Sequence, residues 1–178
     1  MTFRALDFEP TNLAPDVLHA IGLITACSAH TEAVINDAIA GCLGIDVEYG
    51  AAVSTHMSAP MRDDVLRAVA EIRMDNLDDL DRLDELLDEV RQAFRLRNGY
   101  VHGSLCRDKT TNEHFSSQYT ARGSVDVDLV PLSIEKIRSD ANRIYEAGIE
   151  LFDFLNRRGL LGVVLDAPRP RGHKTKAA

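Results

Sequence analysis

Residues 76–103 read NLDDLDRLDELLDEVRQAFRLRNGYVHG, and this stretch decides the fold class. Its apolar side chains recur every three or four residues, at Leu80, Leu83, Leu87, Val90 and Phe94. That spacing places them on one face of a helix, while the acidic residues between them face away. Asn76 is suited to cap the first turn, and Gly99 and Gly103 loosen and stop the last one. The stretch therefore predicts a long amphipathic helix.

Three further long helices and one short one are predicted on either side of this stretch. Pro15 begins a helix that ends near Gly44, and residues 46–54 form a short helical piece. Ser58 and Pro60 mark the next start, and Ser133 caps the last helix. The apolar residues of each long segment keep helical spacing, so each should bury one face.

Between Ser104 and Ser133 the apolar period changes from helical to alternating. Residues 115–121 and 125–129 alternate around Gly123-Ser124, which predicts a β-hairpin, with residues 105–107 as a third strand. The sequence therefore predicts a mainly α-helical domain over residues 1–167, an up-and-down four-helix bundle with a hairpin inserted before the last helix. Residues 168–178 are rich in Pro, Gly, Lys and Arg and predict a disordered basic tail.

Composition narrows the class of protein further. The chain has 178 residues and a net charge of -8, which argues against a general nucleic-acid coat protein and leaves room for a local basic site. Its three cysteines form no CxxC pair, so they are interpreted as small core residues. No window approaches eighteen uncharged apolar residues, and Asp7 interrupts the start where a signal peptide needs apolar residues. These features predict a cytoplasmic protein without membrane contact.

Several motifs that would bring a metal or cofactor are incomplete. His30-Thr31-Glu32 matches half of a zinc deaminase signature, but the PCxxC half is missing. The acidic run from Asp75 lacks the alternating ligands and central Gly of a calcium loop, and its leucines keep helical spacing. HExxH, GxSxG and phosphate-binding Gly-rich loops do not occur. The sequence therefore predicts neither a metal site nor a cofactor.

Arg97 and His102 are the residues best placed for chemistry. Arg97 continues the buried stripe of Val90 and Phe94, where an uncompensated guanidinium is costly and needs a partner or a purpose. Along an unbroken helix, five residues turn His102 roughly 140° away from Arg97. A bend at Gly99 would bring the imidazole back, and we expect that bend.

This segment resembles the signature of the HEPN superfamily, in which an Arg is usually followed by Asn, Asp or His, and a His follows at the end of a bundle helix. Here those residues are Arg97, Asn98 and His102. The resemblance covers the helical frame from about Pro15 to Arg157 in outline, and the hairpin and basic tail lie outside it. It implies a homodimer that brings two such segments together and, in catalytic members, metal-independent cleavage of RNA. It also implies a toxin or phage-defence setting, with an antitoxin or nucleotidyltransferase as partner.

The residues themselves suit this chemistry. A guanidinium at Arg97 binds a phosphate, and the imidazole of His102 takes a proton from a 2′-hydroxyl or gives one to the leaving 5′-oxygen. Asn98 would orient His102 or hold a phosphate oxygen, with Glu32, Arg95 and Tyr100 as supporting residues. Two other interpretations stay open: a module that binds RNA or protein without cutting, and an unrelated helical protein. In the latter, Arg97 anchors the bundle through an ion pair and His102 caps a helix end.

Two further expectations follow from the pattern. Glu32 lies among Ile24, Ser28 and Ile35 on the face of the first helix that should be buried, so we expect it to pair with Arg97 or Arg95. A two-fold dimer is expected because each chain supplies one Arg and one His to the motif. The apolar residues 160–165 would then help to cover its interface.

Overall fold

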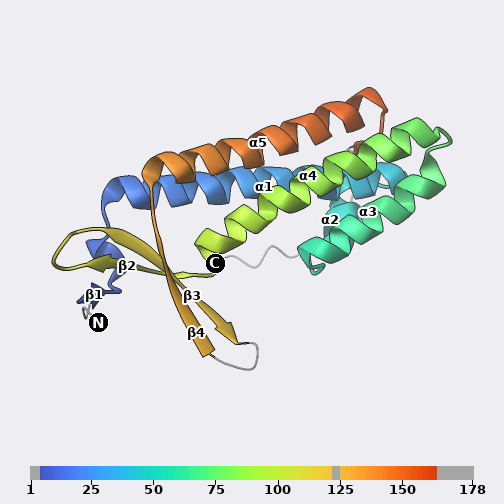
Figure 1. Ribbon diagram of the computed structural model, residues 1–178. Helices are drawn as coiled ribbons and strands as arrows, with labels where there is room; N and C mark the ends of the chain where they lie inside the picture. The colour runs from blue at the N-terminus through green and yellow to red at the C-terminus, as the bar shows by residue number, and fades with distance from the viewer. Residues whose placement is uncertain (1–4, 122–124, 164–178) are drawn as a thin grey trace, which may run out of the picture.

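The computed structural model describes residues 5–121 and 125–163, and within them the chain forms five α-helices, one 3-10 turn and four strands (Figure 1). The helices are α1 (Pro15–Leu43), α2 (Val47–Ser54), α3 (Ala59–Arg73), α4 (Leu77–Val101) and α5 (Ile134–Arg157). The 3-10 turn is η1 (Pro10–Asn12), and the strands are β1 (Leu6–Asp7), β2 (Ser104–Asp108), β3 (His114–Ala121) and β4 (Val125–Pro131). A mainly helical protein is thereby confirmed.

Each helix after α1 begins where the sequence supplies a capping side chain. Ser58, Asn76 and Ser133 accept hydrogen bonds from backbone N–H groups of the first turn, as expected, and Asp46 does the same for α2. Gly44 ends α1 with a φ of 66°, a left-handed conformation that favours glycine. The local signals therefore fix the helix boundaries.

The order of the long helices differs from a strict up-and-down bundle. Helices α1, α3 and α5 run away from the sheet, and α4 runs back toward it (Figure 1). The short α2 returns the chain along α1, so α3 starts beside the middle of α1, where Arg62 pairs with Glu32 at 3.0 Å. The expected alternation is therefore wrong for α1 and α3, which run parallel. Helix α3 is also shorter than α1, so it covers the half of α1 far from the sheet.

The strands form one antiparallel sheet in the order β1-β2-β3-β4 at the end of the bundle (Figure 1). Cys106 pairs with Phe115 and Ser117 pairs with Leu129, which confirms the hairpin and its third strand. The two-residue β1 was not predicted, since so short a strand has no alternation to detect. The turn expected at Gly123-Ser124 lies outside the described residues.

The core fills the space between α1, α4 and α5, with α3 over one side. Helix α1 lies side by side with α5. The backbone of α5 at Gly148 comes close to the Thr31 side chain of α1. By length and composition alone α1 could cross a membrane. In the bundle, however, its Ile24, Ile35 and Ile39 are buried against the other helices. It has the features of a core helix, and the cytoplasmic location stays a prediction.

The segment after α5 packs back onto its own chain. Leu160 is buried, and Gly162 N–H donates to the Asp37 carbonyl at 2.8 Å. Gly41 lies so close to this segment that a Cβ there would be 2.1 Å from the Leu160 carbonyl oxygen. Residues 160–162 therefore cover α1, which removes the reason given above for placing them in a dimer interface. The predicted basic tail lies outside the described residues.

Candidate functional site

The end of α4 continues without a bend through Gly99 to Val101. His102 follows as the C-cap with φ -98° and ψ -7°, so it continues the helical turn, and its N–H donates to the Asn98 carbonyl at 3.1 Å. The side chains of Gln118 and Ser116 on β3 donate to the Gly99 carbonyl at 3.1 and 3.4 Å. Carbonyls in the last turn have no partner within the helix, so β3 stabilises a straight helix end.

Gly103 has a packing role at this junction rather than a conformational one. A Cβ at Gly103 would lie 2.0 Å from the Ser116 hydroxyl, so glycine lets the chain leaving α4 approach β3 closely. Its φ is not in the left-handed region, where the glycines of positive φ are Gly44 and Gly159 among the described residues. The sheet and α4 therefore meet at a tightly packed joint.

Because α4 is unbroken, the expected approach of His102 to Arg97 is wrong. The two side chains leave the helix about 140° apart, and no hydrogen bond joins them. His102 instead shares a stripe with Arg91, Arg95 and Asn98, which precede it at spacings of four, three and four residues. All four residues of this stripe are exposed. In one chain, the arginine of this stripe that lies nearest to His102 along the helix is therefore Arg95, and Arg97 is not on the stripe.

Arg97 lies beside this stripe and faces the bundle. It is partly buried, and its Nε is enclosed without a hydrogen-bond partner among the described residues. Its Nη1 donates to the Asn98 side-chain oxygen at 3.0 Å. No carboxylate of the described chain pairs with it, so the anchoring ion pair considered above is not found there. Arg97 thus holds the side-chain amide of Asn98 through its oxygen, and the NH₂ group remains available as a donor.

Glu32 does not pair with Arg97 or Arg95, and that prediction is wrong. Its carboxylate accepts from Arg62 at 3.0 Å, and the same guanidinium donates through Nε to the Ser54 carbonyl at 3.2 Å. Glu32 lies at the edge of the buried face of α1, on the side of α3. The pair therefore ties α1 to the start of α3 and belongs to the scaffold.

Tyr100 holds the end of α4 onto α5. Its hydroxyl donates to the buried carboxylate of Asp140 at 2.6 Å, and Lys136 Nζ donates to the same carboxylate at 2.8 and 2.9 Å. Burial and the hydrogen bond to Asp140 raise the pKa of Tyr100 well above its usual range. Tyr100 is therefore a neutral hydrogen-bond donor that positions the helix, on the side of α4 away from Asn98. The spacing of Lys136 and Asp140 is visible in the sequence, but their contact with Tyr100 is not.

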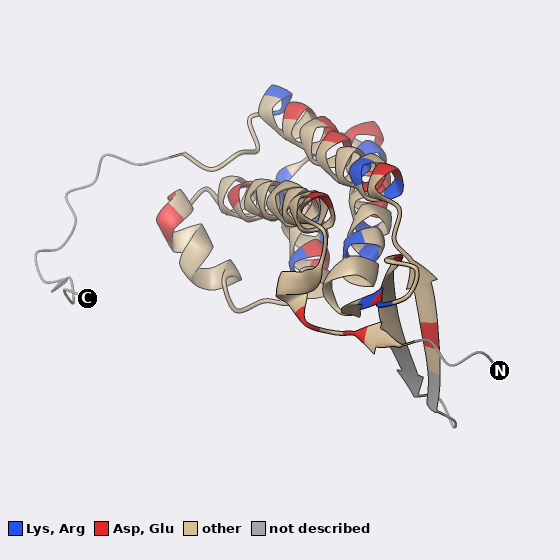
Figure 2. Ribbon diagram, turned by 90° about the vertical axis from the view of Figure 1, so that its left-hand side faces the viewer, with Lys and Arg blue, Asp and Glu red and all other residues tan. Residues whose placement is uncertain are grey.

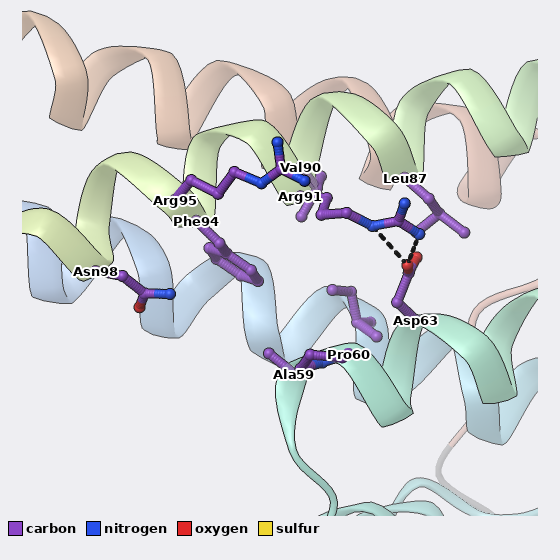
Figure 3. Close-up of a pocket in the computed structure, with 10 residues that line it drawn as sticks. Ala59, Pro60, Asp63, Leu87, Val90, Arg91, Phe94, Arg95 and Asn98 are labelled. Atoms are coloured by element: carbon purple, nitrogen blue, oxygen red, sulfur yellow. Dashed lines mark hydrogen bonds and ion pairs between the residues drawn. The ribbon is translucent and has the colours of Figure 1, made fainter. Parts of the chain in front are cut away.

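A cavity of about 250 Å³ opens beside the exposed stripe (Figure 3). It lies between α4, the first turn of α3 and α1, with Phe94 and Val90 on one wall and Ala59 and Pro60 on the other. Arg95 and Asn98 stand at its edge. Sequence periodicity could not reveal this cavity, because its walls come from three separate helices.

A second cavity, of about 340 Å³, lies on the other side of α4, between α4, the β3–β4 hairpin and the start of α5. Arg95 lines this cavity as well as the first. It makes no ion pair with any carboxylate that the structure describes. Its guanidinium is therefore a positive charge without a carboxylate partner in the described chain, and it lies between the two cavities.

The site has no extended basic surface around it in the part of the chain that the structure describes. Figure 2 shows acidic and basic residues interspersed along the helices, in keeping with the net charge of -8. Arg91, the first arginine of the stripe, is neutralised by Asp63, to which its Nε donates at 3.1 Å.

The described residues hold no group of three or more His, Cys, Asp or Glu side chains that could bind a metal ion.

Comparison of the chain with protein-family models, with curated proteins and with solved structures finds no match. The function must therefore be inferred from the chemistry of the stripe itself. Arg95 supplies a free guanidinium, Asn98 an oriented amide donor, and His102 an exposed imidazole with no hydrogen-bond partner among the described residues. Together they can bind an anion and transfer a proton beside it.

Proposed function

We propose that the protein is a metal-independent endoribonuclease of the HEPN type, in which His102 acts as general base and general acid. The observation that carries this proposal is the exposed stripe of Arg95, Asn98 and His102 on one face of α4. A guanidinium and an amide NH₂ group bind phosphate oxygens, and an imidazole can both take and give a proton. The toxin or phage-defence setting, with its antitoxin or nucleotidyltransferase partner, belongs to the same proposal.

In the proposed reaction the 2′-hydroxyl attacks the adjacent phosphorus while a neutral His102 takes its proton. The bond from phosphorus to the 5′-oxygen breaks, and an imidazolium gives that oxygen a proton. The products are a 2′,3′-cyclic phosphate and a 5′-hydroxyl. Each chain supplies one His102, so acid and base acting together require two copies. A two-fold dimer that joins two α4 ends is therefore part of the proposal, and light scattering should give about twice the chain mass of 19.6 kDa.

We assign the two arginines roles that differ from those the family resemblance implies. Arg95 lies on the face of His102 and has no carboxylate partner in the described chain, so it is assigned the phosphate contact. Arg97, which the family resemblance assigns to the phosphate, holds the Asn98 amide at 3.0 Å and acts as a positioning residue. A second copy of the chain could still bring its own Arg97 into the site, and mutagenesis separates these roles.

One observation favours a second candidate function, an RNA-binding or protein-interaction module without catalysis. Arg97 and His102 point in different directions on a straight helix, so one chain does not assemble the motif at one point. The free guanidinium of Arg95 would still bind a phosphate in such a module. Binding without cleavage is the result that would select this alternative.

The test is cleavage of end-labelled single-stranded and structured RNAs in the presence of EDTA. His102→Ala should reduce the rate by at least about 100-fold, the usual contribution of a general acid or base, with little change in thermal stability. Arg95→Ala should weaken cleavage more than the control Arg138→Ala, which removes an exposed arginine from α5. His19→Ala, an exposed histidine on α1, is the matched control for His102. Equal cleavage by wild type and His102→Ala would refute catalysis at this site.

A further inference from the structure

The exposed side of α1 carries almost no charge. Between Asp16 and Glu32 the helix has no Asp, Glu, Lys or Arg, although Leu23, Ala26 and His30 are exposed along it. A helix face in contact with water normally carries charged residues. This side of α1 therefore has the composition of a surface that another molecule covers.

Helix α5, which lies beside α1 and runs in the same direction (Figure 1), continues this uncharged surface. The Tyr145 ring lies against His30, with 5.8 Å between the ring centroids. Ile149 and Phe152 follow Tyr145 at spacings of four and three residues, which places them on the same stripe of α5. Leu23, Tyr145 and Phe152 are large apolar residues that stay exposed. These five residues form a surface that we call the α1–α5 face.

The α1–α5 face lies away from α4. Arg143 and Glu150 of α5 approach α4, where Arg143 Nη2 donates to the Gln92 side-chain oxygen at 3.5 Å and Arg82 pairs with Glu150 at 3.6 Å. Tyr145 follows Arg143 by two residues, a turn of about 200° around the helix. The face is therefore on the opposite flank of α5 from α4.

Two exposed residues of opposite charge lie at the two ends of the α1–α5 face. Arg138 precedes Tyr145 by seven residues and Asp153 follows it by eight, which is about 11 and 12 Å along the helix axis. Neither residue forms an ion pair within the described chain. If two copies of α5 lie antiparallel with Tyr145 near the centre, Arg138 of each copy comes level with Asp153 of the other.

We infer that the α1–α5 face binds a second copy of this chain in an antiparallel, two-fold arrangement, with α1 against α1 and α5 against α5. A two-fold interface requires a self-complementary surface. Here an uncharged centre meets its own copy, and the charged ends pair reciprocally. Such charge pairs fix the register of a contact. Because α4 lies on the opposite flank, this contact is separate from the one proposed at the α4 ends, and one chain can form both.

The test is charge reversal followed by rescue. Arg138→Asp and Asp153→Arg each replace two attractive pairs of the two-fold contact with two repulsive ones. Self-association, measured by sedimentation velocity over a range of concentrations, should therefore weaken about tenfold in each variant. Mixing the two variant proteins should restore association, because each chain then supplies the charge that the other lacks. The double variant Arg138→Asp, Asp153→Arg should associate like wild type for the same reason.

Matched controls make the same charge changes on the other flank of α5. Arg143→Asp and Glu150→Arg should leave association unchanged, since both positions face α4. Tyr145→Lys places a charge at the centre of the face and should abolish this contact, while far-UV circular dichroism shows that the exposed substitution leaves the helices folded.

Single reversals that associate as strongly as wild type would overturn the inference. Weakened association that neither mixing nor the double variant restores would overturn the reciprocal antiparallel arrangement. RNA cleavage by the same variants should persist, because the α4 ends are not part of this face. Loss of one result without the other therefore separates this inference from the ribonuclease proposal.

Discussion

The contact of α1 with α5 gives the sharpest test of the packing, through Gly148→Ala. A Cβ at Gly148 would lie 2.4 Å from the Thr31 hydroxyl oxygen and 3.2 Å from the Thr31 Cβ. Thr31 is 1% exposed, and its single hydroxyl proton is shared between the carbonyls of Cys27 at 3.1 Å and Ile144 at 3.3 Å. The hydroxyl cannot move aside without losing buried hydrogen bonds, so the helices must separate.

The expected size follows from opposing effects. Overpacking a core costs about 1–3 kcal/mol, and a lost buried hydrogen bond adds about 1 kcal/mol. Alanine in place of glycine within a helix returns about 0.5–1 kcal/mol. Gly148→Ala should therefore lower the free energy of unfolding by about 1–3 kcal/mol. Gly22→Ala, on the exposed side of α1 with nothing within 4 Å of its new Cβ, should raise it by about 0.5–1 kcal/mol.

Urea unfolding followed by far-UV circular dichroism measures both changes, and thermal melts should shift by about 2–4 °C per kcal/mol. In the double variant Thr31→Ala, Gly148→Ala, the new methyl group takes space that the threonine leaves. The two changes should then couple by about 1 kcal/mol or more. A Gly148→Ala protein as stable as Gly22→Ala would refute the close approach of α1 and α5.

Two more predictions concern the joint between the bundle and the sheet. Tyr100→Phe removes a donor from the buried Asp140 carboxylate and should lower the free energy of unfolding by about 1–3 kcal/mol, while Tyr145→Phe, at an exposed position, should not. RNA cleavage by folded Tyr100→Phe protein should persist, and its loss would place Tyr100 in the chemistry. His114 accepts from Ala14 N–H at 3.2 Å, and burial, with a smaller effect of Arg107, lowers its pKa below the ordinary value near 6.5. The unfolded chain therefore binds this proton first, so stability should fall as pH drops below about 6.5. That fall should flatten in His114→Gln, and an unchanged pH profile would contradict the assignment.

Local signals in the sequence were sufficient to predict the helices and the hairpin with its third strand, but not the two-residue β1. The caps at Ser58, Asn76 and Ser133, together with helical and alternating periods, placed the helices and the hairpin where the structure has them. Such signals depend on residues that are close together in the chain, so they can be recognised in a single sequence. The return of the chain through α2 and the pairing of Glu32 with Arg62 depend on how distant segments pack, and no local pattern specifies that.

The bend predicted at Gly99 is the expectation about the candidate site that the structure contradicts. It depended on glycine lacking the side chain that restricts the backbone. Glycine allows a helix to bend but does not make it bend. The hydrogen bonds from Gln118 and Ser116 to the Gly99 carbonyl favour the straight helix. In a straight helix the spacing of Arg91, Arg95, Asn98 and His102 already puts them on one face, and that spacing is legible in the sequence. The family resemblance assigns the phosphate contact to Arg97, whereas helical geometry places Arg95 on the face of His102, so the ratio of cleavage rates for Arg95→Ala and Arg97→Ala decides between them.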